Sequence, residues 1–305
     1  MPDQRSAAPP PGGSRISRRR ALVAAQLAGL LHGPAEALPV SSSAHVALVA
    51  RLAAGRRGRR PADPEVAKSV EVGAHAGTLL GLAVGLRHEA ADALRWVRRE
   101  PRAAAAAAGR IAVASLPAVA AALTLERPIE RHLGGDRAIA SGLLVGGLAM
   151  TLADRRGAGD DDARDWRDAT VVDAAAIGLA QATALWPGVS RSGAVLAAAR
   201  ARGFSRASAG HVSAALAVPV VGGATALKVV RLGARVRQGT IAPASLTPLA
   251  AVTATAAVSG RVAAPIARRT LDGLPLAPFA AYRVVLAGVL LWTDRRWTAV
   301  RERAV

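Results

Sequence analysis

The chain has 305 residues, of which 51% are hydrophobic and only 3% aromatic, and its net charge is +19. It contains no cysteine, which excludes disulfides and cysteine-based metal sites. The basic residues fall in short runs without interleaved aromatic residues, so we expect contact with anionic lipid headgroups and no nucleic acid partner. Long apolar runs alternate with these charged segments, which predicts an all-α, polytopic membrane protein.

The first 20 residues are rich in Pro, Gly, Ser and Arg, and they predict a disordered basic N-terminal arm. Three consecutive arginines, an apolar run and Ala35-Glu36-Ala37 also resemble a secretory signal with a cleavage site. Its removal would give a secreted soluble protein, but the apolar runs continue to Leu291 and disfavour this alternative. We therefore divide the chain into an arm (residues 1–20), a membrane-embedded domain (21–293) and a basic C-terminal tail (294–305).

Two short polar motifs interrupt the apolar sequence and resemble each other, LPVSSSAH at residues 38–45 and WPGVSRSG at residues 186–193. Each joins two apolar runs that are too short to span a membrane, namely 21–38 with 44–54 and 171–186 with 193–201. Two short helices broken at mid-membrane form a re-entrant hairpin. Counting the crossings between them places the hairpins on opposite sides of the membrane. The sequence therefore predicts an inverted repeat with two re-entrant helix hairpins whose tips meet near the midplane.

The first motif and the nearby Glu36 together carry a carboxylate, three hydroxyls and an imidazole. Glu36 lies in apolar sequence, where it needs a partner: a metal ion, a proton that it accepts as a general base, or an arginine in a structural ion pair. Ser41, Ser42 and Ser43 either cap the following helix or present their hydroxyls to a phosphate at its N-terminus. His45 lies in the first turn of that helix. Serine, histidine and carboxylate together can activate a hydroxyl or a water.

The second motif carries an arginine between two serines. The guanidinium of Arg191 can bind a phosphate through two parallel hydrogen bonds, and Ser190 and Ser192 add donors beside it. Gly193 lets the backbone approach the ligand closely. An arginine at membrane depth requires an anion, for which Glu36 is one alternative. The converging hydroxyls favour a bound phosphate instead.

Other polar or small residues in the apolar runs have a simpler interpretation. His75 and the pair Tyr282-Arg283 interrupt apolar sequence, and each is more often a packing residue than a ligand. Gly142 and Gly146, four residues apart, likewise indicate close helix packing. Arginine clusters lie in loops on both sides of the expected membrane, so the charge pattern leaves the orientation open.

Both motifs resemble signatures of one family. Glu36-Ala37-Leu38-Pro39-Val40-Ser41-Ser42-Ser43-Ala44-His45 is similar to E-F-L-P-V-S-S-S/T-G-H, and Pro187-Gly188-Val189-Ser190-Arg191-Ser192-Gly193 is similar to P-G-x-S-R-S-G. These are signatures of the bacterial undecaprenyl-diphosphatases, also called bacitracin-resistance proteins, and the resemblance runs over residues 21–293. It implies a multi-pass enzyme of the bacterial cytoplasmic (inner) membrane with a site on the outer face. Such an enzyme hydrolyses undecaprenyl diphosphate to undecaprenyl phosphate and inorganic phosphate, recycling the lipid carrier for peptidoglycan synthesis.

The resemblance also implies roles for the motif residues. Ser42, or a water in its place, is the nucleophile, and Glu36 and His45 are the metal, base or acid groups. Arg191 holds the diphosphate of a polyprenyl lipid within the membrane. The expected substrate-binding set is completed by Ser41, Ser43, Ser190, Ser192 and Gly193. The oligomeric state is open, with a homo-oligomer as one alternative.

One position departs from the family signature. The family usually has a second glutamate four residues before the first and needs a divalent cation, which the resemblance implies to be Mg²⁺ or Ca²⁺. Here that position is His32, and imidazole prefers softer metals than these two ions. His32 therefore indicates either an altered metal site with Glu36 or a weakened enzyme. The second possibility leaves a non-hydrolytic polyprenyl-phosphate carrier or flippase as the alternative function.

Overall fold

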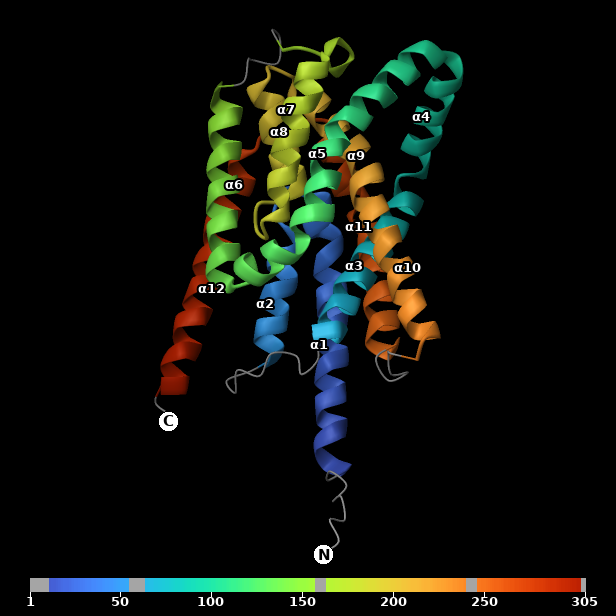
Figure 1. Cartoon of the computed structure of the whole chain (residues 1–305). Helices are drawn as coiled ribbons and strands as arrows, with labels where there is room; N and C mark the ends of the chain where they lie inside the picture. Colours follow the sequence, from blue (N-terminus) through green and yellow to red (C-terminus); the bar gives the residue numbers. More distant parts are fainter. Residues whose placement is uncertain (1–10, 55–63, 157–162, 240–245, 303–305) are drawn as a thin grey trace, which may run out of the picture.

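The computed structural model describes residues 11–54, 64–156, 163–239 and 246–302, and within these ranges it is almost entirely helical and has no β-strand (Figure 1). The expected all-α class is thereby confirmed. The helices are α1 (Pro11–Ala37), α2 (Ser42–Ala54), α3 (Pro64–Gly85), α4 (Arg87–Arg99), α5 (Pro101–Leu133), α6 (Asp136–Arg156), α7 (Val171–Ala182), α8 (Arg191–Ala201), α9 (Arg206–Ala217), α10 (Gly223–Arg237), α11 (Leu246–Leu271) and α12 (Ala277–Glu302).

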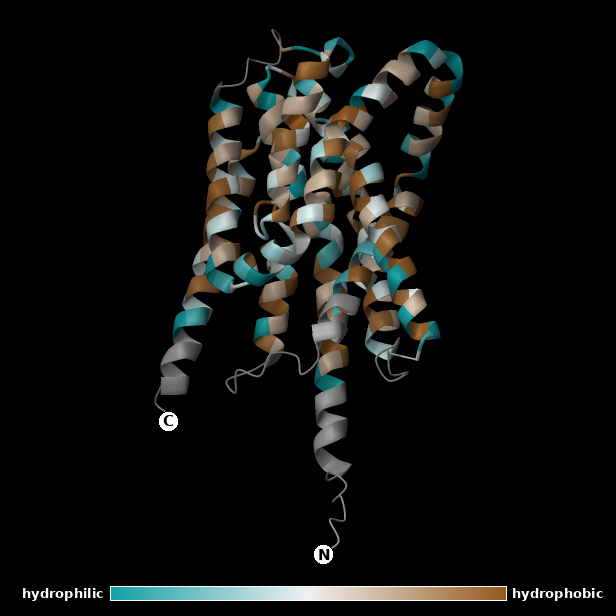
Figure 2. Ribbon diagram, in the orientation of Figure 1, coloured by the Kyte–Doolittle hydropathy of each residue, from teal (hydrophilic) through white to brown (hydrophobic). Residues whose placement is uncertain are grey.

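Four of the described helical segments are long and apolar enough to cross a membrane: Pro101–Leu125, Asp136–Arg155, Arg206–Arg237 and Thr247–Leu271. Many of their apolar side chains point outward; Val218 is 74% exposed and Val262 is 71% exposed. Figure 2 shows hydrophobic residues along the helices, whereas hydrophilic residues gather at the turn between α4 and α5. So much outward apolar surface requires a lipid environment, and the chain is a multi-pass membrane protein.

The two polar motifs form the turns of two helical hairpins, α1 with α2 and α7 with α8. In Figure 1 the hairpins enter the molecule from opposite ends, and both turns lie in its interior. The residue before each second helix has the same unusual backbone, with φ of 71° at Ser41 and 66° at Ser190. A positive φ is uncommon for a residue other than glycine. The two hairpins thus share a local conformation as well as a sequence motif. Their re-entrant position in a bilayer stays a prediction.

Close packing brings α1 and α3 together against α11. The glycines of α3 recur at every fourth residue and all face α11: Gly73, Gly77, Gly81 and Gly85. A Cβ atom at Gly77 or Gly81 would collide with a backbone carbonyl of α11, so these two helices touch through their backbones. Gly33 of α1 also lies directly against the backbone of α11, at Ser259.

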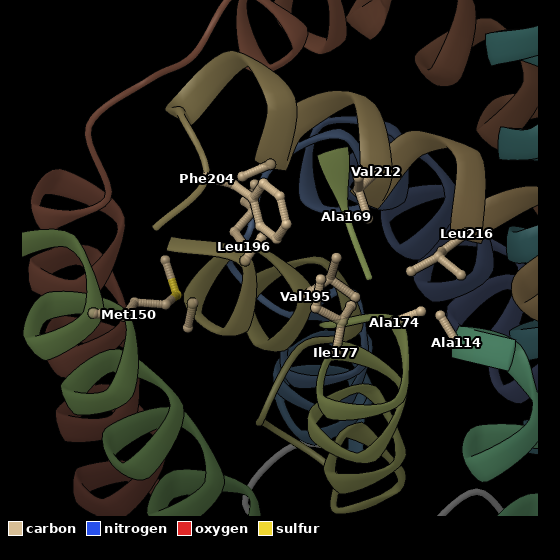
Figure 3. Close-up of a cluster of buried hydrophobic side chains, with 14 of the residues drawn as sticks. Ala114, Met150, Ala169, Ala174, Ile177, Val195, Leu196, Phe204, Val212 and Leu216 are labelled. Carbon is tan, nitrogen blue, oxygen red and sulfur yellow. The ribbon is translucent and has the colours of Figure 1, made fainter. Parts of the chain in front are cut away.

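The second hairpin is fixed by the main hydrophobic core. Figure 3 shows buried side chains of α7, α8 and α9 in contact with Ala114 of α5 and Met150 of α6. Phe204, in the turn between α8 and α9, is fully buried, and its ring packs against Trp166 with 5.6 Å between the ring centroids. This core holds α8 in place, and α8 carries the second polar motif at its N-terminus.

The ends of the described helices differ from the expected arm and tail. α1 begins at Pro11, inside the segment expected to be a disordered arm, and residues 1–10 lie outside the described residues. α12 continues to Glu302, through most of the expected tail. The division of the chain at residues 20 and 293 stays a prediction.

Candidate active site

The first hairpin places a carboxylate against a serine hydroxyl. Glu36 lies in the last turn of α1, and the chain reverses at Pro39 so that α2 begins at Ser42. The Ser42 hydroxyl donates a hydrogen bond of 2.8 Å to Glu36 Oε2. Both side chains are half-buried, so they reach the boundary of the protein interior. A carboxylate in this position can accept the proton of the hydroxyl when that oxygen attacks an electrophile.

The other two serines of the motif interact with each other. The hydroxyls of Ser41 and Ser43 lie 3.0 Å apart, and either can donate. Ser41 is buried and Ser43 is half-buried. Of the three predicted serines, Ser42 is therefore the one in contact with the carboxylate.

His45 is held by two hydrogen bonds. Its Nδ1–H donates to the carbonyl oxygen of Ser41 at 2.8 Å, which leaves Nε2 to accept from the Tyr282 hydroxyl at 2.7 Å. The two rings are nearly parallel, with 5.7 Å between their centroids. Since both ring nitrogens are engaged, the contacts indicate a residue that positions the motif turn. The predicted acid or base role of His45 stays a prediction. Tyr282 comes from α12, and its place in the site was not expected from the sequence.

The second hairpin contributes the arginine and two further hydroxyls. Arg191 donates from Nη1 to the carbonyl of Ser213 at 2.6 Å, whereas its buried Nε has no hydrogen-bond partner within the described residues. Its guanidinium interacts electrostatically with the Glu36 carboxylate. The two predicted catalytic groups from opposite hairpins therefore belong to one site, and Arg191 keeps N–H donors for an anion.

Ser190, Ser192 and Gly193 form the N-terminal turn of α8. The Ser190 hydroxyl accepts from the backbone N–H of Gly193 at 3.3 Å and lies 3.2 Å from the Ser192 hydroxyl. Ser190 thus caps the helix, a role that the sequence indicated as one alternative for the serines of the first motif only, and both serines remain half-buried beside Arg191. Hydroxyls and free backbone N–H groups at a helix N-terminus favour an anion.

Arg283 of α12 ties the two motif turns together. It is fully buried and donates to the carbonyl of Pro39 in the first turn at 3.3 Å. In the second turn it donates at 2.8 Å to each of the carbonyls of Gly188 and Val189. Further bonds reach the carbonyls of Gly142 and Leu143 of α6. The packing interpretation of Arg283 agrees with these contacts, which hold both halves of the site.

Three side chains are close enough to hold a metal ion. One ligand atom from each of His32, Glu36 and His75 lies within 4.8 Å of the other two. Carboxylate oxygen with two imidazoles fits a divalent cation, and the set contains one carboxylate rather than the two that the family signature supplies. His75 was interpreted as packing. Its spacing from Glu36 along the chain gave no sign of contact, because that contact depends on the packing of α3 against α1.

The fold and these contacts define a class: a multi-pass membrane protein with an interior polar site in which a serine donates a hydrogen bond to a carboxylate. Comparison with known proteins identifies the family. Residues 25–289 match the family described as bacitracin resistance protein BacA, and the chain belongs to that family, as the two signatures predict.

Several relatives align over nearly their whole length. A protein of Geobacter sulfurreducens is 38% identical over 88% of this chain and 96% of its own, and one of Geobacter metallireducens is 36% identical over 88% and 97%. A protein of Sorangium cellulosum is 33% identical over 88% of this chain and 85% of its own. All three are named undecaprenyl-diphosphatase.

Proposed function

We propose that this protein hydrolyses undecaprenyl diphosphate to undecaprenyl phosphate and inorganic phosphate, and so recycles the lipid carrier for cell-wall synthesis. The observation that carries the proposal is the 2.8 Å hydrogen bond from Ser42 to Glu36, in the same site as Arg191. Relatives that align over almost the whole chain bear the corresponding name. The substrate is a polyprenyl diphosphate lipid, for which the outward apolar helix surfaces offer a path from the bilayer.

The geometry supports an order of bond changes. Ser42 Oγ attacks the terminal phosphorus while its proton passes to the Glu36 carboxylate, and the P–O bond to undecaprenyl phosphate breaks. Water then hydrolyses the phosphoserine; direct attack by a water held by Glu36 is the variant of this scheme. Arg191 and the serines at the N-terminus of α8 hold the diphosphate and offset the charge that develops in the transition state.

A divalent cation, held by Glu36 with His32 and His75, supplies further charge neutralisation when bound. The resemblance led us to expect Mg²⁺ or Ca²⁺, and this identity stays a prediction. His45 and Tyr282 keep the first turn in place for the reaction.

In the membrane, we infer that the two hairpins belong to the two halves of an inverted repeat. α1 packs against α11, and α7 packs against α5, so each hairpin contacts a long helix from the other half of the chain. Two features support re-entrant hairpins that meet near the midplane: this reciprocal packing of each hairpin against the other half of the chain, and the shared backbone conformation of the two turns. We place the protein in the bacterial cytoplasmic membrane with the site open to the outer face. A homo-oligomer remains one alternative for its assembly.

The second candidate function is a non-hydrolytic carrier or flippase for polyprenyl phosphates. It is favoured by one observation: the hairpins enter from opposite ends, which is the usual architecture of transporters (Figure 1).

Phosphate release by purified protein in detergent separates the two functions. With undecaprenyl diphosphate and Mg²⁺, Ca²⁺, Mn²⁺ or Zn²⁺, we expect turnover by the wild type. Three variants should each lower kcat by about 10²–10⁴-fold. Glu36→Gln removes the base, Ser42→Ala removes the nucleophile, and Arg191→Ala removes the contact with the anion. Ser115→Ala is the matched control, since Ser115 is a buried serine of α5 whose hydroxyl donates to the Ile111 carbonyl of its own helix. Lipid binding by the wild type without phosphate release under any cation would overturn the hydrolase in favour of the carrier.

A further inference from the structure

The cluster of His32, Glu36 and His75 joins α1 and α3, two helices that α2 separates in the sequence. His32 and Glu36 are four residues apart on α1 and therefore share one face of that helix. His75 reaches them from α3, and its ring meets the His32 ring edge-on with 4.4 Å between the centroids. One ligand atom of each residue lies within 4.8 Å of the others, a separation that one bound ion can span with small side-chain adjustments.

His32 has a buried nitrogen that points to a ligand. The residue is fully buried, and its Nδ1 lies 2.9 Å from the Thr78 hydroxyl. Its Nε2 is also buried and has no hydrogen-bond partner within the described residues. A buried polar atom without a partner is costly and rare, and it requires an explanation. A metal ion at Nε2 supplies one.

His75 is oriented in the way that metal-binding histidines usually are. Its Nδ1–H donates to the backbone carbonyl of Glu71 at 3.0 Å, which places the proton on Nδ1 and leaves the Nε2 lone pair available. Thr78 can play the same orienting part for His32. Glu36 binds Ser42 through Oε2, so Oε1 is available as the third ligand atom.

We propose that His32, Glu36 and His75 bind a transition-metal ion of the zinc type, in preference to Mg²⁺ or Ca²⁺. Two imidazole nitrogens and one carboxylate oxygen are the ligand set of many catalytic zinc sites, with a fourth position left for water or substrate. Mg²⁺ and Ca²⁺ prefer oxygen ligands, and this cluster offers one carboxylate only. Imidazole suits Zn²⁺, Co²⁺, Ni²⁺ and Fe²⁺. The inference deepens the proposed function, on which it rests for the role of the ion beside Ser42.

Metal binding can be measured without substrate. Chelator-treated protein in detergent is dialysed against Zn²⁺ with a large excess of Mg²⁺, and bound metal is counted per chain; Co²⁺ loading is followed by its visible absorption. We expect one Zn²⁺ per chain, retained against Mg²⁺. His75→Gln and His32→Gln should each weaken Zn²⁺ binding by more than about 100-fold, since even the loss of an orienting partner costs 10–100-fold.

The matched control is His211→Gln, because His211 donates to the Ala207 carbonyl at 2.9 Å as His75 does to Glu71, but lies exposed on α9. It should bind Zn²⁺ like the wild type. His32→Glu restores a carboxylate and should shift the preference toward Mg²⁺ and Ca²⁺, a gain that an unfolded variant cannot show. Equal Zn²⁺ binding by the wild type and both histidine variants would indicate an adventitious ion only and overturn the proposal.

The outcomes for the site and for the enzyme are separable. Zinc binding that depends on His32 and His75, without phosphate release, would support the metal site and refute the hydrolase. Phosphate release with Mg²⁺ by a wild type that binds no Zn²⁺ would refute the metal site and leave the hydrolase intact.

Discussion

The replacement of Arg283 by methionine tests whether one buried side chain holds both halves of the site. Arg283 is fully buried and bonds to backbone carbonyls of the first turn, the second turn and α6. Methionine has a similar length and no donor, so Arg283→Met leaves these carbonyls without their partner. A charged donor contributes about 1.5–3 kcal/mol per hydrogen bond, so the two 2.8 Å bonds to Gly188 and Val189 alone represent about 3–6 kcal/mol.

The net loss is smaller than this sum, because removing the guanidinium also removes the cost of burying its charge. We expect the free energy of unfolding to fall by about 2–4 kcal/mol, within the range seen when a buried polar network is broken. Arg283→Lys keeps the charge but offers only three donors from one nitrogen, so it should recover part of this stability.

The assay combines thermal stability in detergent with phosphate release below the melting temperature. Arg283→Met should lower both, because the turns that carry Ser42 and Arg191 lose a common anchor. Val212→Ala, in the core of α7, α8 and α9, is the control: it should lower the melting temperature and leave kcat of the folded protein unchanged. Wild-type kcat in folded Arg283→Met would refute the reasoning.

Three more variants test single contacts of the structure. Gly146→Ala places a Cβ against the Arg283 guanidinium and 2.8 Å from the Val189 carbonyl, so this variant should lower both the melting temperature and kcat. The control is Gly288→Ala, which has open space around its Cβ position and should lower neither. Tyr282→Phe removes the 2.7 Å bond to His45, worth about 1 kcal/mol, and should lower kcat by roughly fivefold or less without loss of folding. The hydrogen bond from Arg268 of α11 holds the pKa of Glu89 below its usual value, so this contact stabilises the fold at neutral pH and is lost as the pH falls through the lowered pKa. Glu89→Gln should therefore lower the melting temperature at neutral pH but not in strong acid; an equal effect at both would contradict this.

Local signals in the sequence were enough to predict the two hairpins. The predicted runs end at residues 54 and 201, and α2 and α8 end at the same residues. Proline ends a helix and serine begins one, so the information lies within a few residues of each turn. The beginning of α1 at Pro11 was not predicted, because a segment rich in Arg, Ser and Gly carries no apolar periodicity to indicate a helix.

The partners of the motif residues could not be predicted in the same way. Tyr282 is 237 positions from His45 in the chain, and Thr78 is 46 positions from His32, so these contacts depend on which helices pack together. One indication was present in the sequence: glycines at every fourth position of 73–85 predict a close helix neighbour. The glycine pattern does not identify the neighbouring helix. The approach of His75 to Glu36 follows only once α1 and α3 are known to contact each other, with α11 packed against both.

The strained serines and Arg283 together explain why the two motifs must act as one unit. Ser41 and Ser190 both hold a positive φ, which costs of order 1–3 kcal/mol and persists only when the surroundings enforce it. Arg283 bonds the carbonyls of Pro39, just ahead of the first strained serine, and of Val189, directly before the second. Because one guanidinium bonds to both turns, a movement of either turn disturbs the side chain that restrains the other. The distance between Ser42 and Arg191, on which binding of a diphosphate depends, is therefore set by a residue that belongs to neither motif.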